Sequence, residues 1–554
     1  MLTEEKPLKV NKLTITSQPA QVFSNKHKVE VGEVSLHALC KKVLNGKRLL
    51  IASNRGPVTY ERTEEGELLA RRGSGGVVTA LNALTNYTPI TWIAAALSPE
   101  DRNLACGRFP VQTVNHNLNL RFVSIEQQCF ENYLNVISNP LLWFIQHGRQ
   151  AELRESLTHS TITQAWKNGY WQANQEFART IVAEASRPGA APFVIIHDYQ
   201  LYLVPKMVRA QRPDLNLLHF THIPWPAPEN WRTLPDTIVH SICESLLQCD
   251  IASFQTNADV EAFVQTCAVY LPELVLEKKD NGSFTLKNPG RNGRNTQILA
   301  LPISIDPNQL RREYLSQKVK EWQSKLAAMC GTNTNNEVAS KISKLIVRVD
   351  RLDPSKNVLA GFEAYEQLLQ QRPDLLKKIT FLALLVPTRE SVPEYTAYRE
   401  RAFALIERIN RRFGTADWQP IHYTYSNDYH RALAALSMAD VILINSLADG
   451  MNLVAKEACI VNEKDAVLVL SQKTGAWQEL GHYALGIADP ENRIETAQML
   501  EKALSMPLSE RKTRSRKLAS IVQSADLTNW LAAQLNGLHG ARSARAATRI
   551  TLPG

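Results

Sequence analysis

The chain has 554 residues, of which 44% are hydrophobic and 21% are charged. This composition is typical of soluble globular proteins and excludes the disordered, fibrous and disulfide-scaffold classes, and the length predicts two or more domains. The formal net charge of +9 comes mainly from the ends, because residues 1–48 hold nine basic and four acidic side chains and residues 541–554 add three arginines. The body is therefore near neutral, which argues against nucleic-acid binding.

Targeting and metal-binding patterns are not visible in the sequence. The first residues lack the charged and then apolar order of a signal peptide, and no run of about 18 apolar residues occurs, so we expect a cytoplasmic protein that does not contact a membrane. The eight cysteines include no CxxC pair and no clustering with histidine, which predicts free thiols and no metal cofactor. The sequence leaves the oligomeric state open, a homo-oligomer included.

Apolar runs of strand length recur from residue 48 onward, each followed by a stretch of helical period, which predicts repeated βα units. A first series covers residues 49–53, 90–96, 193–197, 215–222, 250–255 and 298–303, and a second covers residues 345–350, 379–386, 440–445 and 466–471. Unbroken aliphatic runs are typical of strands buried on both faces of a parallel sheet. We therefore expect an α/β fold with two doubly wound halves and a seam near residues 303–310.

Helical period is also legible in residues 396–414, 427–440 and 496–538, where Asn427 is the expected cap of the second helix. The two ends of the chain show little periodicity and predict flexible arms. Because ligands of doubly wound sheets bind beyond the carboxyl ends of the strands, polar residues just after each run are the candidate site.

In the first half, three groups of polar residues follow strands. The first strand ends in Ser53-Asn54-Arg55-Gly56, and after a hairpin-like segment the glycine-rich residues 73–76 lead into a helix, where backbone N–H groups can approach an anion. Asp198 and His222 follow later strands, where a carboxylate and an imidazole suit sugar hydroxyls. A plain turn and a satisfied strand-end histidine are the alternative interpretations.

In the second half, Arg351 and Lys356 are five residues apart in a strand-to-helix turn, a spacing that suits a diphosphate and equally a solvated basic turn. Asp449 follows a later strand, and Glu457 lies eight residues on, about two helical turns away. A carboxylate at Glu457 can accept both hydroxyls of a ribose; a capping acid and an exposed helix acid are the alternatives.

Six motifs in order, SNRGP, GSGG, IIHDYQL, HIPWPAPENWRTLP, RLDPSK and DGMNLVAKE, resemble the trehalose-6-phosphate synthase family of retaining, nucleotide-sugar-dependent glycosyltransferases, from about residue 48 to about residue 538. The resemblance implies the GT-B fold, two facing Rossmann-like domains with doubly wound parallel sheets and a C-terminal crossover helix. The expected division is an N-terminal flexible extension at 1–47, an acceptor domain at 48–303, a nucleotide-sugar domain at 304–510, a returning helix at 511–540 and a basic tail at 541–554.

The resemblance also implies roles for individual residues. The partners would be a nucleotide-sugar, UDP-glucose or GDP-glucose, and glucose 6-phosphate, joined without a metal into α,α-trehalose 6-phosphate. The expected donor-binding residues are Gly76, His222, Arg351, Lys356, Asp449, Leu453 and Glu457. The expected acceptor-binding residues are Arg55, Trp143, Asp198 and Arg389. The expected catalytic residues are Asp198, His222, Arg351 and Lys356.

Departures from the family pattern concern mainly the acceptor. Leu134 and Ala95 stand where trehalose-phosphate synthases usually carry aromatic residues, Ala448 replaces an arginine and Asn357 a glycine, and several stretches look more like validoxylamine-phosphate synthases. A different phosphorylated polyol or cyclitol, as in the glucosylglycerol-phosphate or validoxylamine-phosphate synthases, is therefore the alternative acceptor. A non-catalytic sugar-phosphate sensor is a further alternative, which the intact set of charged site residues disfavours.

Overall fold

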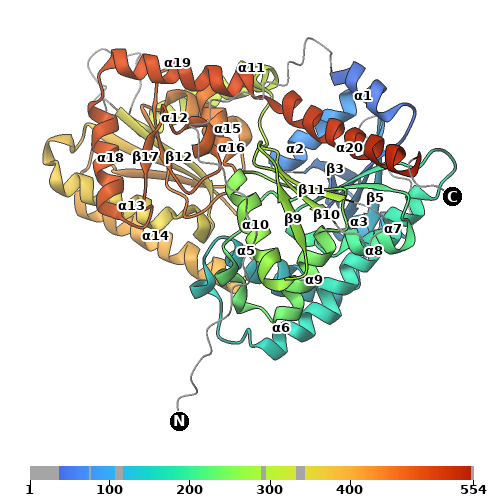
Figure 1. Ribbon diagram of the computed structural model, residues 1–554. Coiled ribbons are helices and arrows are strands. Elements are labelled where there is room, and N and C mark those ends of the chain that lie inside the picture. Colours follow the sequence, from blue (N-terminus) through green and yellow to red (C-terminus); the bar gives the residue numbers. More distant parts are fainter. Residues whose placement is uncertain (1–35, 74–75, 107–116, 288–294, 332–343, 551–554) are drawn as a thin grey trace.

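The computed structural model describes residues 36–73, 76–106, 117–287, 295–331 and 344–550. These residues form two α/β domains that face each other, the first on the right of Figure 1 and the second on the left. Two parts of the sequence-based prediction lie outside the described residues: Ser74 and Gly75 of the glycine-rich loop, and the ends of the chain at 1–35 and 551–554.

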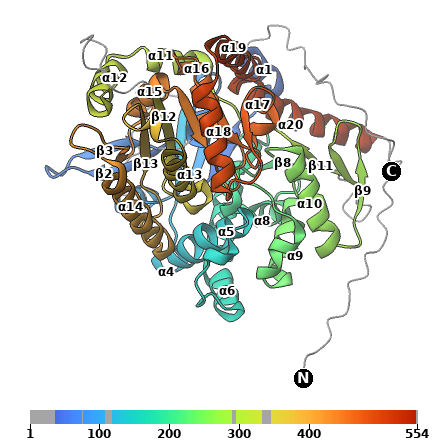
Figure 2. The same cartoon turned by 90° about the vertical axis from the view of Figure 1, so that its left-hand side faces the viewer.

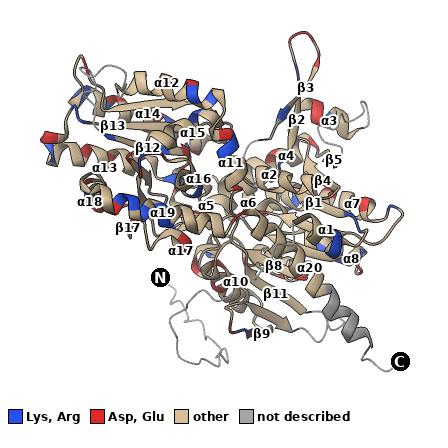
Figure 3. Ribbon diagram, turned by 90° about the horizontal axis from the view of Figure 1, so that it is seen from above, with Lys and Arg blue, Asp and Glu red and all other residues tan. Residues whose placement is uncertain are grey.

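The first domain is built on a nine-stranded sheet. In spatial order its strands are β5 (Leu118–Val123), β4 (Ile90–Ala95), β1 (Leu49–Ser53), β6 (Phe193–His197), β7 (Asn216–Phe220), β8 (Ile251–Phe254), β11 (Asn295–Ala300), β10 (Phe284–Lys287) and β9 (Val275–Lys278). Pairing is parallel from β5 to β11 and antiparallel for β10 and β9. Every residue of β1, β4, β6 and β7 is buried, because helices cover both faces. A hairpin, β2 (Val58–Arg62) and β3 (Leu68–Arg72), projects from this domain in Figure 3.

The second domain holds a six-stranded sheet in which all pairs are parallel. Its strands, in spatial order, are β14 (Ile421–Tyr425), β13 (Ile379–Val386), β12 (Lys344–Arg351), β15 (Val441–Ile444), β16 (Val467–Ser471) and β17 (Leu485–Ile487). The strand order reverses beside β12, as it does beside β1 in the first sheet. Chain segments leave such strands toward opposite sides, and a crevice for ligands forms beyond their carboxyl ends.

Helices cover both faces of each sheet. Those of the first domain are α1 (Leu36–Leu44), α2 (Gly76–Asn82), α3 (Pro99–Ala105), α4 (Gln127–Phe130), α5 (Trp143–Gln146), α6 (His159–Ala165), α7 (Gln172–Ala185), α8 (Val204–Gln211), α9 (Asp236–Leu246) and α10 (Asn257–Tyr270). Between α4 and α5 the chain widens into a π-helical segment, Glu131–Leu142, which directs the following Trp143 toward the second domain.

The later helices are α11 (Pro307–Tyr314), α12 (Gln317–Cys330), α13 (Val358–Gln371), α14 (Pro393–Phe413), α15 (Tyr429–Met438), α16 (Leu453–Val461), α17 (Ala476–Leu480), α18 (Arg493–Ser505), α19 (Leu508–Ser524) and α20 (Leu527–Ile550). Helices α13, α14 and α18 cover one face of the second sheet, and α13 and α18 lie side by side in Figure 2. Helices α12, α15, α16 and α19 cover the other face. The two apolar layers bury every residue of β15 and β16 and most residues of β12 and β13, which explains why these strands are aliphatic.

Each apolar run that predicted a strand overlaps one, and the hairpin-like segment after the first strand is the β2–β3 hairpin. No strand was predicted at β5, β9, β10, β14 or β17. All of these except β10 are edge strands, and β10 has only four residues. The expected cap of α15 at Asn427 is wrong by one residue, because the side chain of Asp428 accepts the hydrogen bond from the backbone N–H of Arg431.

The two ends of the described chain differ from the predicted arms. Leu36–Leu44 form α1, whose apolar side packs against α20, so the order of the chain begins before residue 48. The segment 511–540 contains two helices: α19 packs on the second sheet and α20 crosses to the first domain beside α1 (Figure 1). Residues 541–550 continue α20.

The chain therefore passes between the domains twice, after β11 and between α19 and α20. These connections lie together, since the backbone N–H of Leu527 donates to the carbonyl of Ile305 at 2.8 Å. All eight cysteines are free, and six are buried. Among the described residues no helix is long and apolar enough to cross a membrane.

Candidate active site

Residues that follow the strands beside the two points of reversal meet where the two domains face each other, and we call this meeting place the crevice. Arg55 follows β1 and Asp198 follows β6 in the first domain. In the second domain Arg351 ends β12, Arg389 follows β13 and Asp449 follows β15. The doubly wound topology of each half thus brings together residues that are far apart in the sequence, and it does so at the carboxyl ends of the strands.

Two guanidinium groups lie over the indole of Trp143, and a third, that of Arg55, lies within range of their charges. The guanidinium carbon of Arg389 lies 3.8 Å from the ring centroid and that of Arg351 lies 4.9 Å from it. Loss of hydration, and then the positive charges of Arg389 and Arg351, lower the pKa of Arg55. The guanidinium of Arg351 makes no hydrogen bond or ion pair with the described residues, and repulsion among the three cations favours an anionic ligand among them.

Asp353 supplies a negative charge behind this cluster and connects the domains. Its Oδ1 accepts the indole N–H of Trp143 at 3.2 Å and the backbone N–H and hydroxyl of Ser355 at 2.9 and 2.8 Å. Its Oδ2 accepts Nη1 of Arg389 at 2.6 Å and the hydroxyl of Tyr395 at 3.2 Å. Burial alone would raise the pKa of Asp353, but Arg389 and Arg351 hold it below its usual range, so the carboxylate is ionised.

Aromatic residues continue this contact between the domains. Nη2 of Arg389 donates to the hydroxyl of Tyr199, from the first domain, at 3.2 Å. Tyr395 stacks on Phe144 with ring centroids 5.8 Å apart. His147 stacks on Trp143 at 4.1 Å, and burial lowers the pKa of His147 to about 4, which keeps the ring neutral. The indole N–H of Trp143, expected to bind an acceptor phosphate, is thus already donated to Asp353.

On the other side of the turn, the ammonium of Lys356 pairs with the carboxylate of Asp449. Asn452 donates to the same carboxylate at 2.9 Å and also caps α16. Burial acts to raise the pKa of Asp449, but Lys356 and the hydrogen bonds outweigh it and lower that pKa. Lys356 and Asp449, which the sequence predicted separately as donor-binding residues, therefore form one ion pair before any ligand binds.

A buried network of hydrogen bonds and one ion pair holds the turn that contains Lys356. Arg348 is fully buried, pairs with Asp350 at 3.0 Å and donates to the backbone carbonyl of Lys356 at 2.8 Å. Asn357 has a φ of 56°, in the left-handed region where glycine is favoured and asparagine is the best-tolerated alternative. Its side chain donates to the carbonyl groups of Asn445 and Pro490 at 3.2 and 2.6 Å, which explains why the turn tolerates Asn357.

Two glycines allow close approach of the domains. A Cβ atom on Gly450 would overlap the carbonyl oxygen of His222 and lie 2.9 Å from its carbonyl carbon. A Cβ atom on Gly76, the first residue of α2, would overlap the side chain of Leu453, the first residue of α16. The starts of two helices, one from each domain, therefore meet at the crevice, where Gly76 and Leu453 are in contact.

Asp198 and His222 lie at the floor of the crevice. Oδ1 of Asp198 accepts the backbone N–H of His222 at 3.1 Å, and burial raises the pKa of Asp198 to about 6. Nε2 of His222 lies 3.0 Å from Nδ1 of His197, and burial lowers the pKa of His222 to about 3. Both rings are neutral, and Nε2 of His222 is engaged by His197. Direct contact of His222 with a donor sugar stays a prediction.

Glu457 lies in α16 and is partly buried. Burial raises the pKa of Glu457 to about 7, and within the described part of the chain its carboxyl makes no hydrogen bond or ion pair. A desolvated carboxyl without a partner is costly and is found mostly where a ligand binds.

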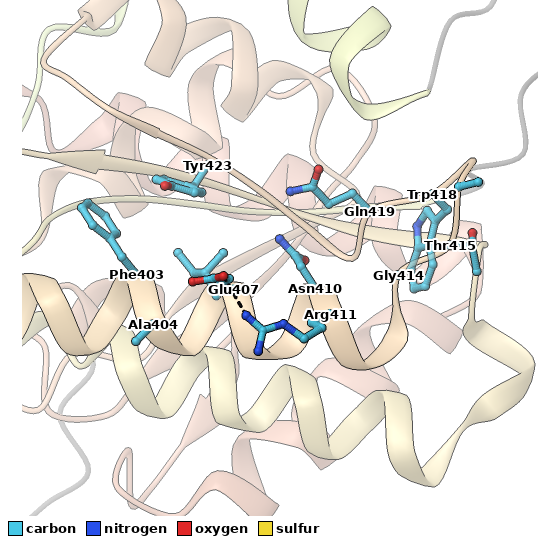
Figure 4. Close-up of a pocket in the computed structure, with 12 residues that line it drawn as sticks. Phe403, Ala404, Glu407, Asn410, Arg411, Gly414, Thr415, Trp418, Gln419 and Tyr423 are labelled. Carbon is cyan, nitrogen blue, oxygen red and sulfur yellow. Dashed lines mark hydrogen bonds and ion pairs between the residues drawn. The ribbon is translucent and has the colours of Figure 1, made fainter.

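A groove of ≈ 880 Å³ lies elsewhere, between α14 and β14 on the outer side of the second domain (Figure 4). Its polar side chains include Glu407 and Arg411, which pair with each other at 2.8 Å. None of the predicted site residues lines this groove. Because its charges satisfy one another, the crevice and not this groove is the candidate active site.

The structure therefore gathers the predicted residues into one crevice. Sequence reasoning missed Asp353, Tyr199, Tyr395 and His147, although Asp353 lies inside the RLDPSK motif. An aspartate before a proline indicates only a turn. Nothing in the local sequence indicates that Asp353 contacts residues far along the chain, one of them in the other domain. Among the described residues no group of three or more His, Cys, Asp and Glu side chains is arranged to hold a metal ion.

Two facing doubly wound domains, a crossover helix and a cationic crevice define a GT-B glycosyltransferase. The sequence profile of glycosyltransferase family 20 matches residues 47–540. The chain belongs to this family, the family of the trehalose-6-phosphate synthases.

Relatives by sequence agree with this assignment. The chain is 30% identical to the alpha,alpha-trehalose-phosphate synthase (UDP-forming) of Schizosaccharomyces pombe, over 90% of this chain and 91% of that one. It is 29% identical to synthase A of Dictyostelium discoideum, where it covers 87% of its own length but only 61% of the relative. It is also 27% identical to the validamine 7-phosphate valienyltransferase of Streptomyces hygroscopicus subsp. jinggangensis, over 91% of this chain and 97% of that one.

Solved structures are similar over most of the chain. The alpha,alpha-trehalose-phosphate synthase from Burkholderia xenovorans in complex with glucose-6-phosphate superimposes with a TM-score of 0.74 and 26% identity, covering 89% of this chain and all of that one. The E. coli protein bound with UDP-2-fluoro glucose gives a TM-score of 0.72 and 26% identity, covering 89% and 99% of the two chains.

Proposed function

We propose that this chain transfers glucose from UDP-glucose to glucose 6-phosphate and forms α,α-trehalose 6-phosphate and UDP. The observation that carries the proposal is the meeting of Arg351, Arg389 and Arg55 from two domains beside Lys356 and Asp198. A crevice with this charge suits two phosphorylated substrates. The UDP-forming names of the relatives support UDP rather than GDP in the donor.

The chemistry proposed is a front-face displacement with retention. The bond between the anomeric carbon and the diphosphate oxygen breaks, and the acceptor hydroxyl oxygen bonds to that carbon on the same face. The hydroxyl proton passes to the departing phosphate oxygen. Negative charge grows on the diphosphate, which Arg351 and Lys356 would stabilise, while Asp198 would hold the acceptor near its attacking hydroxyl. No step of this scheme requires a metal ion.

The remaining residues would bind and orient the substrates. Arg55 and Arg389 would hold the acceptor phosphate with Trp143 beside them, and because they come from both domains, binding would favour closure. Asp449 and His222 would meet the donor sugar. Gly76, Leu453 and Glu457 would meet the rest of the nucleotide-sugar.

The test is a screen of donors and acceptors with the purified chain. UDP-glucose and GDP-glucose are each incubated with glucose 6-phosphate and with other sugar and cyclitol phosphates, and the released nucleoside diphosphate and the disaccharide product are measured. We expect UDP release with glucose 6-phosphate and a product that is α,α-trehalose 6-phosphate. Turnover only with another acceptor would refute the proposed acceptor, and tight binding without turnover would favour the sensor.

A cyclitol phosphate is the second candidate acceptor, and two side chains favour it. Ala95 is buried in β4 and Leu134 packs against the core of the first domain, so neither position offers an aromatic ring or hydroxyl to a ligand. Loss of one hydroxyl ligand to a charged phosphate costs about 1.5–3 kcal/mol. The similarity to the valienyltransferase of Streptomyces adds support, and the same screen decides between the acceptors.

Binding of the ribose should depend on pH through Glu457. If its carboxylate accepts the ribose hydroxyls, affinity falls as the pH drops through about 7, because the protonated carboxyl must ionise before it accepts both hydroxyls. We expect uridine, which carries no titrating phosphate, to bind up to about tenfold more weakly per pH unit below that point. Calorimetry at pH 6 and pH 8 measures the ratio, and in Glu457→Gln the ratio should vanish; an equal slope in that variant would contradict the role.

A further inference from the structure

Asp353 belongs to two groups of residues at once. It lies in the same turn as Arg351 and Lys356, two residues after the first and three before the second, and its Oδ1 accepts the N–H and hydroxyl of Ser355 within that turn. Its other contacts run to Arg389 and Tyr395 of the same domain and to Trp143 of the opposite domain. One carboxylate therefore connects the turn on the donor side to the groups on the acceptor side.

The carboxylate is a fixed part of the fold. It is fully buried and accepts five hydrogen bonds, so both oxygens are satisfied and neither is open to a ligand. Arg389 is held at the same time by Tyr199 and Tyr395, at 3.2 and 2.8 Å. A guanidinium fixed on one edge by a carboxylate presents its remaining N–H groups in one direction, which is the arrangement that recognises a phosphate.

We propose that Asp353 is a positioning residue for the acceptor phosphate and that it couples acceptor binding to donor binding. This inference rests on the proposed function. A diphosphate bound by Arg351 and Lys356 adds contacts to the turn that holds this carboxylate. It therefore stabilises the arrangement in which Asp353 orients Arg389 and Trp143. The acceptor then meets a preorganised site that already joins both domains, and by linkage the acceptor strengthens nucleotide binding by the same factor.

The opposite effect of Asp353 on acceptor affinity has a chemical basis, since its carboxylate occupies N–H groups that a phosphate would otherwise accept. In that case Asp353 would compete with the acceptor, and its removal would tighten acceptor binding. The burial of the carboxylate and its attachment to Ser355 favour positioning, because a competitor must leave its donors when the ligand arrives. The two signs make the proposal testable.

The test compares the full chain with Asp353→Asn, which keeps the size of the side chain and removes its charge. Isothermal titration measures the affinity for glucose 6-phosphate with and without saturating UDP. In the unaltered chain UDP should tighten acceptor binding by about fivefold or more. In Asp353→Asn we expect acceptor affinity in the presence of UDP to fall about tenfold and the enhancement by UDP to approach one, with UDP binding alone changed by less than about threefold.

The matched control is Asp440→Asn. Asp440 is also a buried carboxylate of the second domain, where it accepts the backbone N–H of Leu345 at 3.0 Å at the opposite end of β12. We expect this variant to lose thermal stability while keeping the enhancement by UDP. If Asp353→Asn shows no cooperative melting, Tyr395→Phe takes its place, because it removes one hydroxyl from the same cluster, and it should reduce the enhancement in the same direction.

Unchanged or tighter acceptor binding in Asp353→Asn, or an unchanged enhancement by UDP, would overturn the proposal. Inorganic phosphate serves as a second probe, since it carries the anion without the sugar. If the unaltered chain binds phosphate but not glucose 6-phosphate, the proposed acceptor fails, and the phosphate titrations of the two variants decide the role of Asp353. If the unaltered chain binds neither probe, this inference fails too.

Discussion

Lys356→Ala and Arg351→Ala are each expected to lower kcat about a hundredfold, the size of effect seen when one preorganised donor to a developing charge is removed. Lys356 is fixed by Asp449 and by the network under its backbone, and Arg351 is held over Trp143 with its N–H groups unused by the described residues. Neither group has to reorganise as the diphosphate departs, so the loss should appear in kcat more than in KM for the acceptor.

Steady-state rates with UDP-glucose and glucose 6-phosphate measure this effect, and melting temperatures confirm that the variants fold. Matched controls are Lys206→Ala and Arg411→Ala, which remove exposed cations paired with Glu244 and Glu407 at 2.6 and 2.8 Å. Both controls should keep normal rates. Normal rates in Lys356→Ala and Arg351→Ala themselves would refute the assignment of the crevice as the active site.

Gly450→Ala is expected to lower kcat/KM by about a hundredfold without unfolding either domain. The added methyl group would overlap the carbonyl oxygen of His222, and since both partners are backbone groups, the crevice must widen to admit it. Arg351 and Lys356 would then stand too far from groups of the first domain. A displacement of about 1 Å between reacting groups can reduce the rate by about two orders of magnitude.

Kinetics and small-angle scattering test this together. In the unaltered chain, UDP with glucose 6-phosphate should produce the more compact form, and in Gly450→Ala the compaction should be smaller. Gly540→Ala is the matched control, because a Cβ atom at that helical position meets nothing within 4 Å, so both rate and scattering should stay unchanged. A fully active Gly450→Ala would show that closure does not bring these backbones together.

The architecture was largely predictable because parallel strands buried on both faces are long aliphatic runs. The runs in β12 and β13 predict strands for this reason. β14, with the sequence IHYTY, has no such run, because it lies at the edge of the sheet and lacks a partner strand on one side. The whole of α1 lies in the segment predicted as a flexible extension, because nine residues give too few helical turns to distinguish a helix from an irregular arm.

The candidate site could be predicted only in part, for a physical reason. Arg351, Lys356 and Asp449 follow strands directly, so topology alone predicts that they meet. The partners of Asp353 come from residues 143, 389 and 395, and no rule of spacing relates them. That His222 gives its ring nitrogen to His197 was equally unpredictable, because it depends on how two neighbouring strands align their side chains.

The paired connections between the halves of the molecule have a mechanical consequence. A single peptide linker would let the two domains rotate about several axes. Two connections joined by the hydrogen bond from Leu527 to Ile305 instead form a single hinge. We expect the domains to rotate mainly about this hinge, so that the same surfaces of the two domains meet each time the molecule closes. We expect that cutting the chain at one connection would leave the halves attached yet loosen this guidance.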